Sequence, residues 1–254
     1  MAGLTTSVLL LLGLIGLLGG IGITALGPGG VLPTIGLFAL TDLTASQVAG
    51  TAIVTHVATG ALATCAYARS GQFRDRPTLR TALLLAATAA VGTPLGVMVN
   101  AGVSKRAFGA VLGVIVALVA ALVWYREYRA QTARASHPPV AVVAVLGLAV
   151  SMAAGIIGVG GPMLTVPLLI ALGVPLLQSL AAAQAQSVVI ATIGTVGYLS
   201  QGAINWPLAL VVGIPELAGV LLGWKIARTL PTRSLKKAMV LTLATLSVYL
   251  VLHG

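Results

Sequence analysis

Long apolar runs separated by short polar stretches dominate the pattern of the 254-residue chain. A helix needs about 20 apolar residues to cross a bilayer, and two of the runs, 31–40 and 162–172, are too short. We interpret each of these as a half-helix attached to the longer run before it. The pattern predicts an all-α membrane protein with about eight hydrophobic segments, built from the runs 7–26, 31–40, 45–68, 78–99, 107–125, 139–157, 162–172, 175–199, 206–224 and 235–252.

Each short run follows a glycine-rich interruption. The first is Gly27-Pro28-Gly29-Gly30, and the second is "IGVGG" over 157–161. Glycine and proline both disfavour a helix interior, so the chain is expected to leave its helix at these places. New helices are then expected to begin at Val31 and Pro162, since a proline is well tolerated in a first helical turn.

The sequence around the two interruptions repeats at an offset of 131 residues. We infer an internal duplication, as in transporters built from structural repeats. Its parts are a first repeat over 1–130, a basic linker over 131–138 and a second repeat over 139–254, all within one membrane domain. Identical pairs include Gly27/Gly158, Gly29/Gly160, Gly30/Gly161, Thr34/Thr165, Gln47/Gln178, Tyr67/Tyr198 and Gly71/Gly202.

The distribution of Lys and Arg bears on how the repeats are oriented. The stretches 69–80, 126–138 and 225–237 carry twelve basic residues, and 100–106 carries two. Four simple crossings per half would divide these residues equally between the two sides. If each glycine-broken segment is instead a re-entrant hairpin, all twelve fall on one side, as the positive-inside rule favours. This arrangement predicts inverted repeats with the three basic stretches in the cytoplasm, although a first segment that crosses fully stays open.

The composition agrees with a membrane protein. The chain is 58% hydrophobic and 7% charged, with a mean hydropathy of +1.09, whereas soluble domains carry about a quarter charged residues. The net charge of +10 comes from clusters without interleaved aromatic residues, so nucleic acid is not an expected partner. One cysteine, Cys65, offers neither a disulfide nor a metal cluster, and no cofactor is expected. Without a basic start typical of a signal peptide, 6–26 is expected to be retained.

The interruptions themselves suggest a binding site. Non-helical backbone at membrane depth is tolerated only where protein or a water-filled cavity encloses it, and the N-terminus of a half-helix offers free N–H groups to an anion. The alternative is that the glycines only permit close helix packing. The residues expected to bind the substrate here are Gly29, Gly30, Val31, Gly160, Gly161 and Met163.

Polar side chains within the segments add further candidates. Gln47, Thr51, Gln178 and Gln186 carry amides and a hydroxyl that can donate to the oxygens of an anion. Hydrogen bonding between helices is the alternative role of such residues in membranes. Asp42 is expected to cap the helix that begins near residue 45.

Two titratable residues lie mid-segment and are candidates for proton coupling. His56 can change charge in the physiological range, and an intramembrane carboxylate such as Glu216 is usually functional or paired. Purely structural hydrogen bonding stays open for both. His56 lies opposite Ser187 by the repeat, but no Gly-x-Ser-x-Gly motif surrounds Ser187, so an intramembrane enzyme is not favoured.

Three stretches resemble the TauE/SafE family of sulfite and organosulfonate exporters: "GIIGVGGPMLTVPLLIALGVPLLQSLAAAQAQSV" over 155–188, "GYLSQGAINWPLAL" over 197–210 and "ARTLPTRSLKKAM" over 227–239. The first half departs from the family pattern through Pro28 and through "THVATG" over 55–60.

The resemblance implies a secondary transporter that moves sulfite, sulfoacetate or a related organosulfonate across the cytoplasmic membrane, with export as the expected direction. It does not fix which anion this chain moves. An anion channel or uniporter is the alternative. A small anion and the lipid bilayer are the expected partners, and a homodimer stays open.

Overall fold

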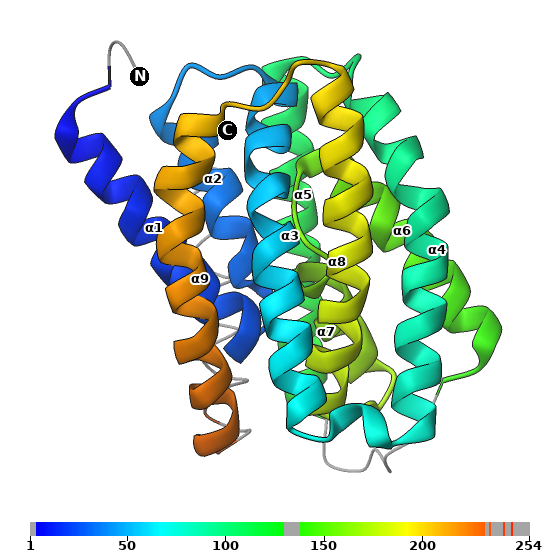
Figure 1. Cartoon of the computed structure of the whole chain (residues 1–254). Helices are drawn as coiled ribbons and strands as arrows, with labels where there is room; N and C mark the ends of the chain where they lie inside the picture. The colour runs from blue at the N-terminus through cyan, green and yellow to red at the C-terminus, as the bar shows by residue number, and fades with distance from the viewer. Residues whose placement is uncertain (1–3, 130–137, 232–233, 235–240, 242–244, 246–254) are drawn as a thin grey trace.

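The computed structural model describes residues 4–129 and 138–231, together with the single positions 234, 241 and 245. Its secondary structure is entirely helical in these residues (Figure 1). The predicted linker 131–138, apart from Pro138, and most of the last predicted segment, 235–252, lie outside them. The helices are α1 (Thr6–Ala25), α2 (Val31–Leu40), α3 (Ala45–Arg69), α4 (Arg76–Asn100), α5 (Lys105–Arg129), α6 (Val140–Ile157), α7 (Pro162–Ala171), α8 (Leu176–Ser200) and α9 (Trp206–Thr229), with short 3-10 turns η1 (Pro28–Gly30) and η2 (Gln72–Arg74).

Six of the helices in the described part are long and apolar enough to cross a membrane: α1, α3, α4, α6, α8 and α9. A helix satisfies its backbone hydrogen bonds internally, which a bilayer demands. Helix α3 begins with a capping box, in which Thr44 accepts from the N–H of Gln47 and Gln47 accepts from the N–H of Thr44. The expectation that Asp42 caps this helix is therefore wrong, because Thr44 occupies the N-cap position.

The two glycine interruptions end helices as the sequence predicts. Helix α1 stops at Ala25 and is followed by Gly27 with a φ of 101°. Helix α6 stops at Ile157 and is capped by Gly158 with a φ of 70°. Residues other than glycine rarely adopt such positive φ values, so both breaks depend on these glycines. The half-length helices α2 and α7 begin at Val31 and Pro162, which confirms that prediction.

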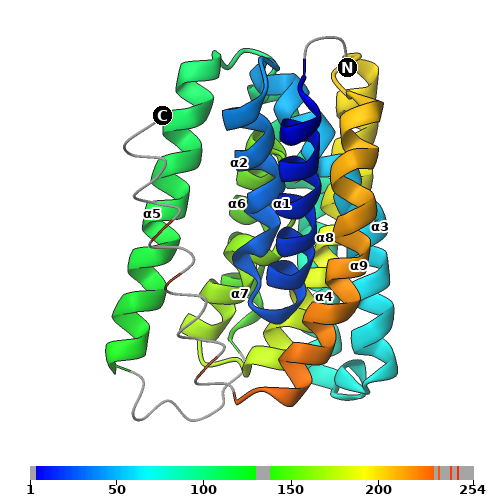
Figure 2. The same cartoon turned by 90° about the vertical axis from the view of Figure 1, so that its left-hand side faces the viewer.

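Each break turns the chain back on itself. In Figure 1 the chain enters α1 and leaves α2 at the upper end, whereas it enters α6 and leaves α7 at the lower end. Figure 2 shows the same opposed directions from the side, with α5 standing beside the other helices. The two broken segments therefore approach the middle of the bundle from opposite ends.

The same helix packing occurs twice. Helix α1 packs along α9, α6 packs along α4, and α3 and α8 lie side by side between these pairs (Figure 1). Glycines allow the close approach, as is common between membrane helices. A Cβ atom at Gly223 of α9 would overlap backbone of Ile21 in α1. The 131-residue offset relates Gly223 to Gly92 of α4 and Ile21 to Met152 of α6. A Cβ atom at Gly92 would likewise lie 3.1 Å from the backbone nitrogen of Met152.

Two tyrosines that are 131 residues apart make equivalent hydrogen bonds. The hydroxyl of Tyr67 donates to the carbonyl oxygen of Thr24 at 2.6 Å, and that of Tyr198 donates to the carbonyl oxygen of Gly155 at 2.6 Å. Both tyrosines are fully buried. Each therefore ties the last turn of a helix that ends at a break to the long helix following that break.

Candidate functional site

The two breaks meet beside one imidazole. His56 lies in the middle of α3 and is fully buried. A Cβ atom at Gly30 would lie 3.5 Å from Cε1 of His56, and one at Gly160 would lie 3.6 Å from its Cδ2. Because Gly30 precedes α2 and Gly160 precedes α7, the N-termini of both half-helices point toward the region of this side chain.

Glu216 of α9 lies against the same imidazole. Its Oε1 atom is 3.2 Å from Nδ1 of His56, and both side chains are fully buried. The distance fits an ion pair, and neither atom has a hydrogen-bond partner in the structure. The second imidazole nitrogen, Nε2, and the second carboxylate oxygen, Oε2, also lack a hydrogen-bond partner in the structure. Such a group is costly to leave unsatisfied in an apolar interior, so this pair points to a functional role.

The second break keeps free backbone donors. Among the described residues, the N–H groups of Gly160, Gly161 and Met163 have no backbone partner, and Pro162 has no N–H. The positive end of the α7 dipole adds to these donors. Together they form an arrangement that suits a small anion.

Polar groups of α8 surround this break. The hydroxyl of Ser187 is buried without a hydrogen-bond partner, and a Cβ atom at Gly160 would lie only 2.6 Å from it. Gln186 accepts from the hydroxyl of Thr165 at 2.5 Å and donates to the carbonyl oxygen of Gly147 at 3.4 Å. Gln184 of the same helix instead contacts the first broken segment, where it donates to the carbonyl oxygen of Ile23 in α1 at 2.9 Å. Of these side chains, Ser187 is the one with an unpaired donor next to the break.

The first break is held by close backbone contacts, as the second is where a Cβ atom at Gly158 would overlap backbone of Ala49. A Cβ atom at Gly29 would overlap backbone of Gly22 in α1, so Gly29 serves a close helix contact. Gly27 packs against α7, with its Cβ position 3.0 Å from the carbonyl oxygen of Pro162. Thr34 of α2 donates in turn to the carbonyl oxygen of Gly158 at 3.3 Å. Each break is thus held by the half-helix of the other.

The remaining predicted residues fall into two groups, those at the starts of the half-helices and those away from His56. Val31 and Met163 are fully buried at the starts of α2 and α7, and Gly161 contacts Gln186. Three others do not join the cluster. Gln47 and Thr51 lie near the start of α3, where Gln47 completes the capping box and Thr51 accepts from the N–H of Asn205 at 2.9 Å. Gln178 lies in the first turn of α8, nine residues or about 13 Å before Ser187.

The pairing of His56 with Glu216 is the feature that sequence reasoning missed. The two residues are far apart in the chain, and only the contact between α3 and α9 brings them together. A usable signal existed, because the chain has only four acidic residues and one of them lies mid-helix in an apolar segment. A buried acid of this kind usually has a partner.

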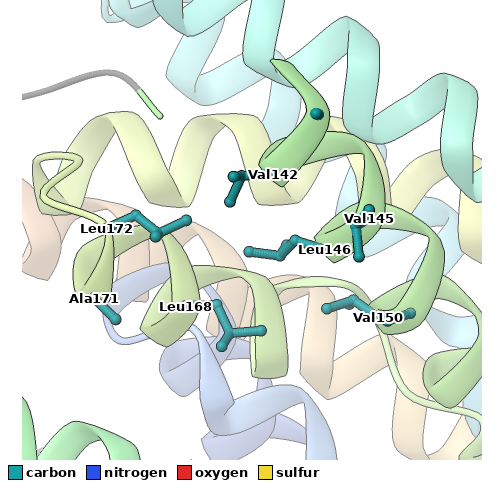
Figure 3. A pocket seen from close by; sticks show the side chains of 9 residues that line it. Val142, Val145, Leu146, Val150, Leu168, Ala171 and Leu172 are labelled. Atoms are coloured by element: carbon teal, nitrogen blue, oxygen red, sulfur yellow. The ribbon is translucent and has the colours of Figure 1, made fainter. Parts of the chain in front are cut away.

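An apolar groove lies elsewhere in the described structure. The groove lies between α6 and α7 and has a volume of about 650 Å³. Its lining is apolar and includes Val145, Leu146 and Leu168 (Figure 3). An anion would find no hydrogen-bond donor among these side chains. The groove is therefore not the candidate site.

Comparison with known proteins identifies the family. The family model of the sulfite exporter TauE/SafE family matches residues 12–250, so the chain belongs to this family. No curated protein and no solved structure matches the chain. Membership in a transporter family, together with six helices of membrane-spanning length in the described residues, makes this a multi-pass membrane protein.

The contact between Gly160 and Ser187 gives a first prediction. Replacing Gly160 with alanine forces its Cβ against the Ser187 hydroxyl, and such overpacking typically costs about 1–3 kcal/mol. We expect Gly160→Ala to lower the Tm of the purified protein in detergent. The double variant Gly160→Ala/Ser187→Ala should recover at least half of the loss, because the clashing oxygen is gone.

The single variant Ser187→Ala is the control. Its hydroxyl has no hydrogen-bond partner to lose, so its Tm should stay close to that of the unmodified protein. Strictly additive losses in the double variant would show that the two residues do not touch.

Proposed function

We propose that this member of the TauE/SafE family is a secondary transporter that moves a small sulfur-containing anion across the cytoplasmic membrane. Sulfite is the substrate that the description of the family names, and we propose sulfoacetate and related organosulfonates beside it. Export is the proposed direction, and proton coupling through His56 and Glu216 is part of the proposal. An anion channel or uniporter is the outcome that absence of coupling would favour.

One observation supports the anion site above all. The N-termini of two half-helices converge beside a buried histidine that lacks a hydrogen-bond partner at Nε2. Broken helices in other transporter folds direct their positive ends at anionic groups in the same way. We assign the anion to the second break, where the N–H groups of Gly160, Gly161 and Met163 are free in the described structure. Gln186 would hold Thr165 and the start of α7 in place.

Inverted repeats are part of the proposal. The opposed directions of the two broken segments (Figure 1), the two equivalent glycine contacts and the two equivalent tyrosine bonds support it. A duplication related by an axis in the membrane plane would produce these equivalences. In such a fold each broken segment enters and leaves the membrane on one side.

The basic residues suggest the orientation. The 69–76 connection and the end of α9, with Lys225 and Arg228, lie at one end of the bundle, whereas Lys105 and Arg106 lie at the other (Figure 1). Most of the stretch 126–138 and most of 232–237 lie outside the described residues. By the positive-inside rule, we place the end with the 69–76 connection in the cytoplasm.

Single cysteines introduced in a Cys65→Ser background test this orientation. A cysteine in place of Gln72 and one in place of Arg228 should each react with a membrane-impermeant reagent only from the cytoplasmic face, and one in place of Gly102 only from outside. Labelling of positions 72 and 228 from opposite faces would contradict both the orientation and the inverted repeats.

Flux measurements in proteoliposomes test the function. Sulfite, sulfoacetate, taurine, thiosulfate and sulfate are offered in turn, with and without a pH gradient. We expect uptake of sulfite or an organosulfonate that responds to the pH gradient. Gly161→Val should reduce this flux at least tenfold, because its side chain would press on Gln186 and on backbone of Ala183.

Gly102→Val is the matched control, since a Cβ atom at Gly102 meets nothing closer than 3.8 Å and flux should be retained. If no sulfur anion is moved by the unmodified protein, the proposed function is wrong. Flux that ignores the pH gradient would favour the channel or uniporter.

A further inference from the structure

The protonation state of the His56 and Glu216 pair determines whether Nε2 of His56 accepts or donates a hydrogen bond. We propose that one proton taken up by this pair turns Nε2 of His56 from a hydrogen-bond acceptor into a donor, and so switches on anion binding at the second break. The inference rests on the proposed function and concerns the regulation of the same site. It makes Glu216 the residue that keeps the site closed to anions when the pair lacks this proton.

The geometry places the two nitrogens of one ring in different surroundings. Nδ1 faces the Glu216 carboxylate at 3.2 Å, and Nε2 has no hydrogen-bond partner. On the other side of the ring, Cδ2, the carbon bonded to Nε2, lies 3.6 Å from the Cβ position of Gly160. Cε1, the other carbon bonded to Nε2, lies 3.5 Å from the Cβ position of Gly30, so Nε2 is on the edge of the ring that borders both breaks.

The protonation of the imidazole determines which of its nitrogens can donate. A neutral imidazole has one N–H and one acceptor nitrogen. Beside an ionised Glu216, the N–H is best placed on Nδ1, where it meets the carboxylate. Nε2 then carries a lone pair, which repels an anion.

One additional proton on the pair removes the lone pair from Nε2 and gives this nitrogen a hydrogen. It comes from water and binds to the pair, which leaves two possible distributions. If it binds to the ring, both nitrogens carry a hydrogen. If it binds to Glu216, the carboxyl group donates to Nδ1 and the ring hydrogen moves to Nε2. In both distributions Nε2 becomes a donor on the edge of the ring that borders the two breaks, and the pair has gained one positive charge that favours an anion.

Other titratable groups do not compete within this interior. Helices α1, α2, α6 and α7 and the turn η1 carry no acidic, basic, cysteine or tyrosine residue in their described ranges, and they carry no histidine. The titratable residues on the other helices that pack around the pair lie toward the helix ends. They are Cys65, Tyr67 and Arg69 on α3, Arg76 and Arg80 on α4, Tyr198 on α8, and Lys225 and Arg228 on α9. Among the described residues, we therefore assign proton uptake on anion binding to His56 and Glu216.

The variant Glu216→Gln separates this switch from a static role. A glutamine amide can donate to Nδ1 without being protonated, so Nε2 of His56 can carry the hydrogen at any pH. Glu216→Asp keeps a carboxylate and serves as the matched control. Thermal unfolding of both variants in detergent shows whether they are folded.

The measurement is the affinity for sulfite of the purified full chain between pH 6 and pH 9. Comparing variant and unmodified protein at each pH cancels the protonation of sulfite itself. We expect the affinity of Glu216→Gln relative to the unmodified protein to rise with pH, by up to about tenfold per pH unit, as linkage to one proton requires. Glu216→Asp should follow the unmodified protein more closely.

A second measurement needs no variant. Calorimetry in buffers of different ionisation enthalpy should show uptake of a proton when the unmodified protein binds sulfoacetate, whose charge is constant in this pH range. A constant affinity ratio for Glu216→Gln, or binding of sulfoacetate without proton uptake, would overturn the switch and leave the transporter in place. Failure of the unmodified protein to bind either anion at any pH would overturn the proposed function and the switch together.

Discussion

Polypeptide that leaves a helix inside a bilayer must be enclosed by other protein, and this constraint organises the whole structure. Two such breaks exist here, and each is held by the half-helix of the other through Thr34 on one side and Gly27 on the other. Around them α1 packs along α9 and α6 along α4, with glycines that bring the backbones close. The enclosure leaves a small polar interior, and the buried pair of His56 and Glu216 lies inside it.

Local signals in the sequence predict the breaks well. Glycine and proline act over one or two residues, so the starts of α2 at Val31 and α7 at Pro162 followed from the sequence alone. The role of Gln47 is local as well, because Thr44-x-x-Gln47 is a capping box. Gln47 is interpreted as a binding residue because its amide lies beside an apolar run. Its position three residues after the N-cap Thr44 explains it instead. The pair of His56 and Glu216 depends instead on how α3 packs against α9, which no local pattern encodes.

The duplication that we propose would explain the repeated helix packing, but not the residues of the candidate site. By the 131-residue offset, His56 corresponds to Ser187 and Glu216 corresponds to Leu85, so neither titratable residue has a titratable counterpart. The breaks differ as well, since the Cβ position of Gly30 lies 2.8 Å from the apolar side chain of Ile23, whereas that of Gly160 lies 2.6 Å from the unpaired hydroxyl of Ser187. On this proposal, two similar halves contain one site without a counterpart, and we place both the proton and the anion there.

The central claim is that the anion binds beside His56, and nuclear magnetic resonance of its imidazole nitrogens tests this most directly. The chain has three histidines, so replacing His137 and His253 leaves one labelled ring in the full-length protein. We predict that sulfite shifts the Nε2 resonance of His56 saturably, toward the value of a protonated nitrogen. Unchanged imidazole resonances in a protein that still transports sulfite would contradict the account.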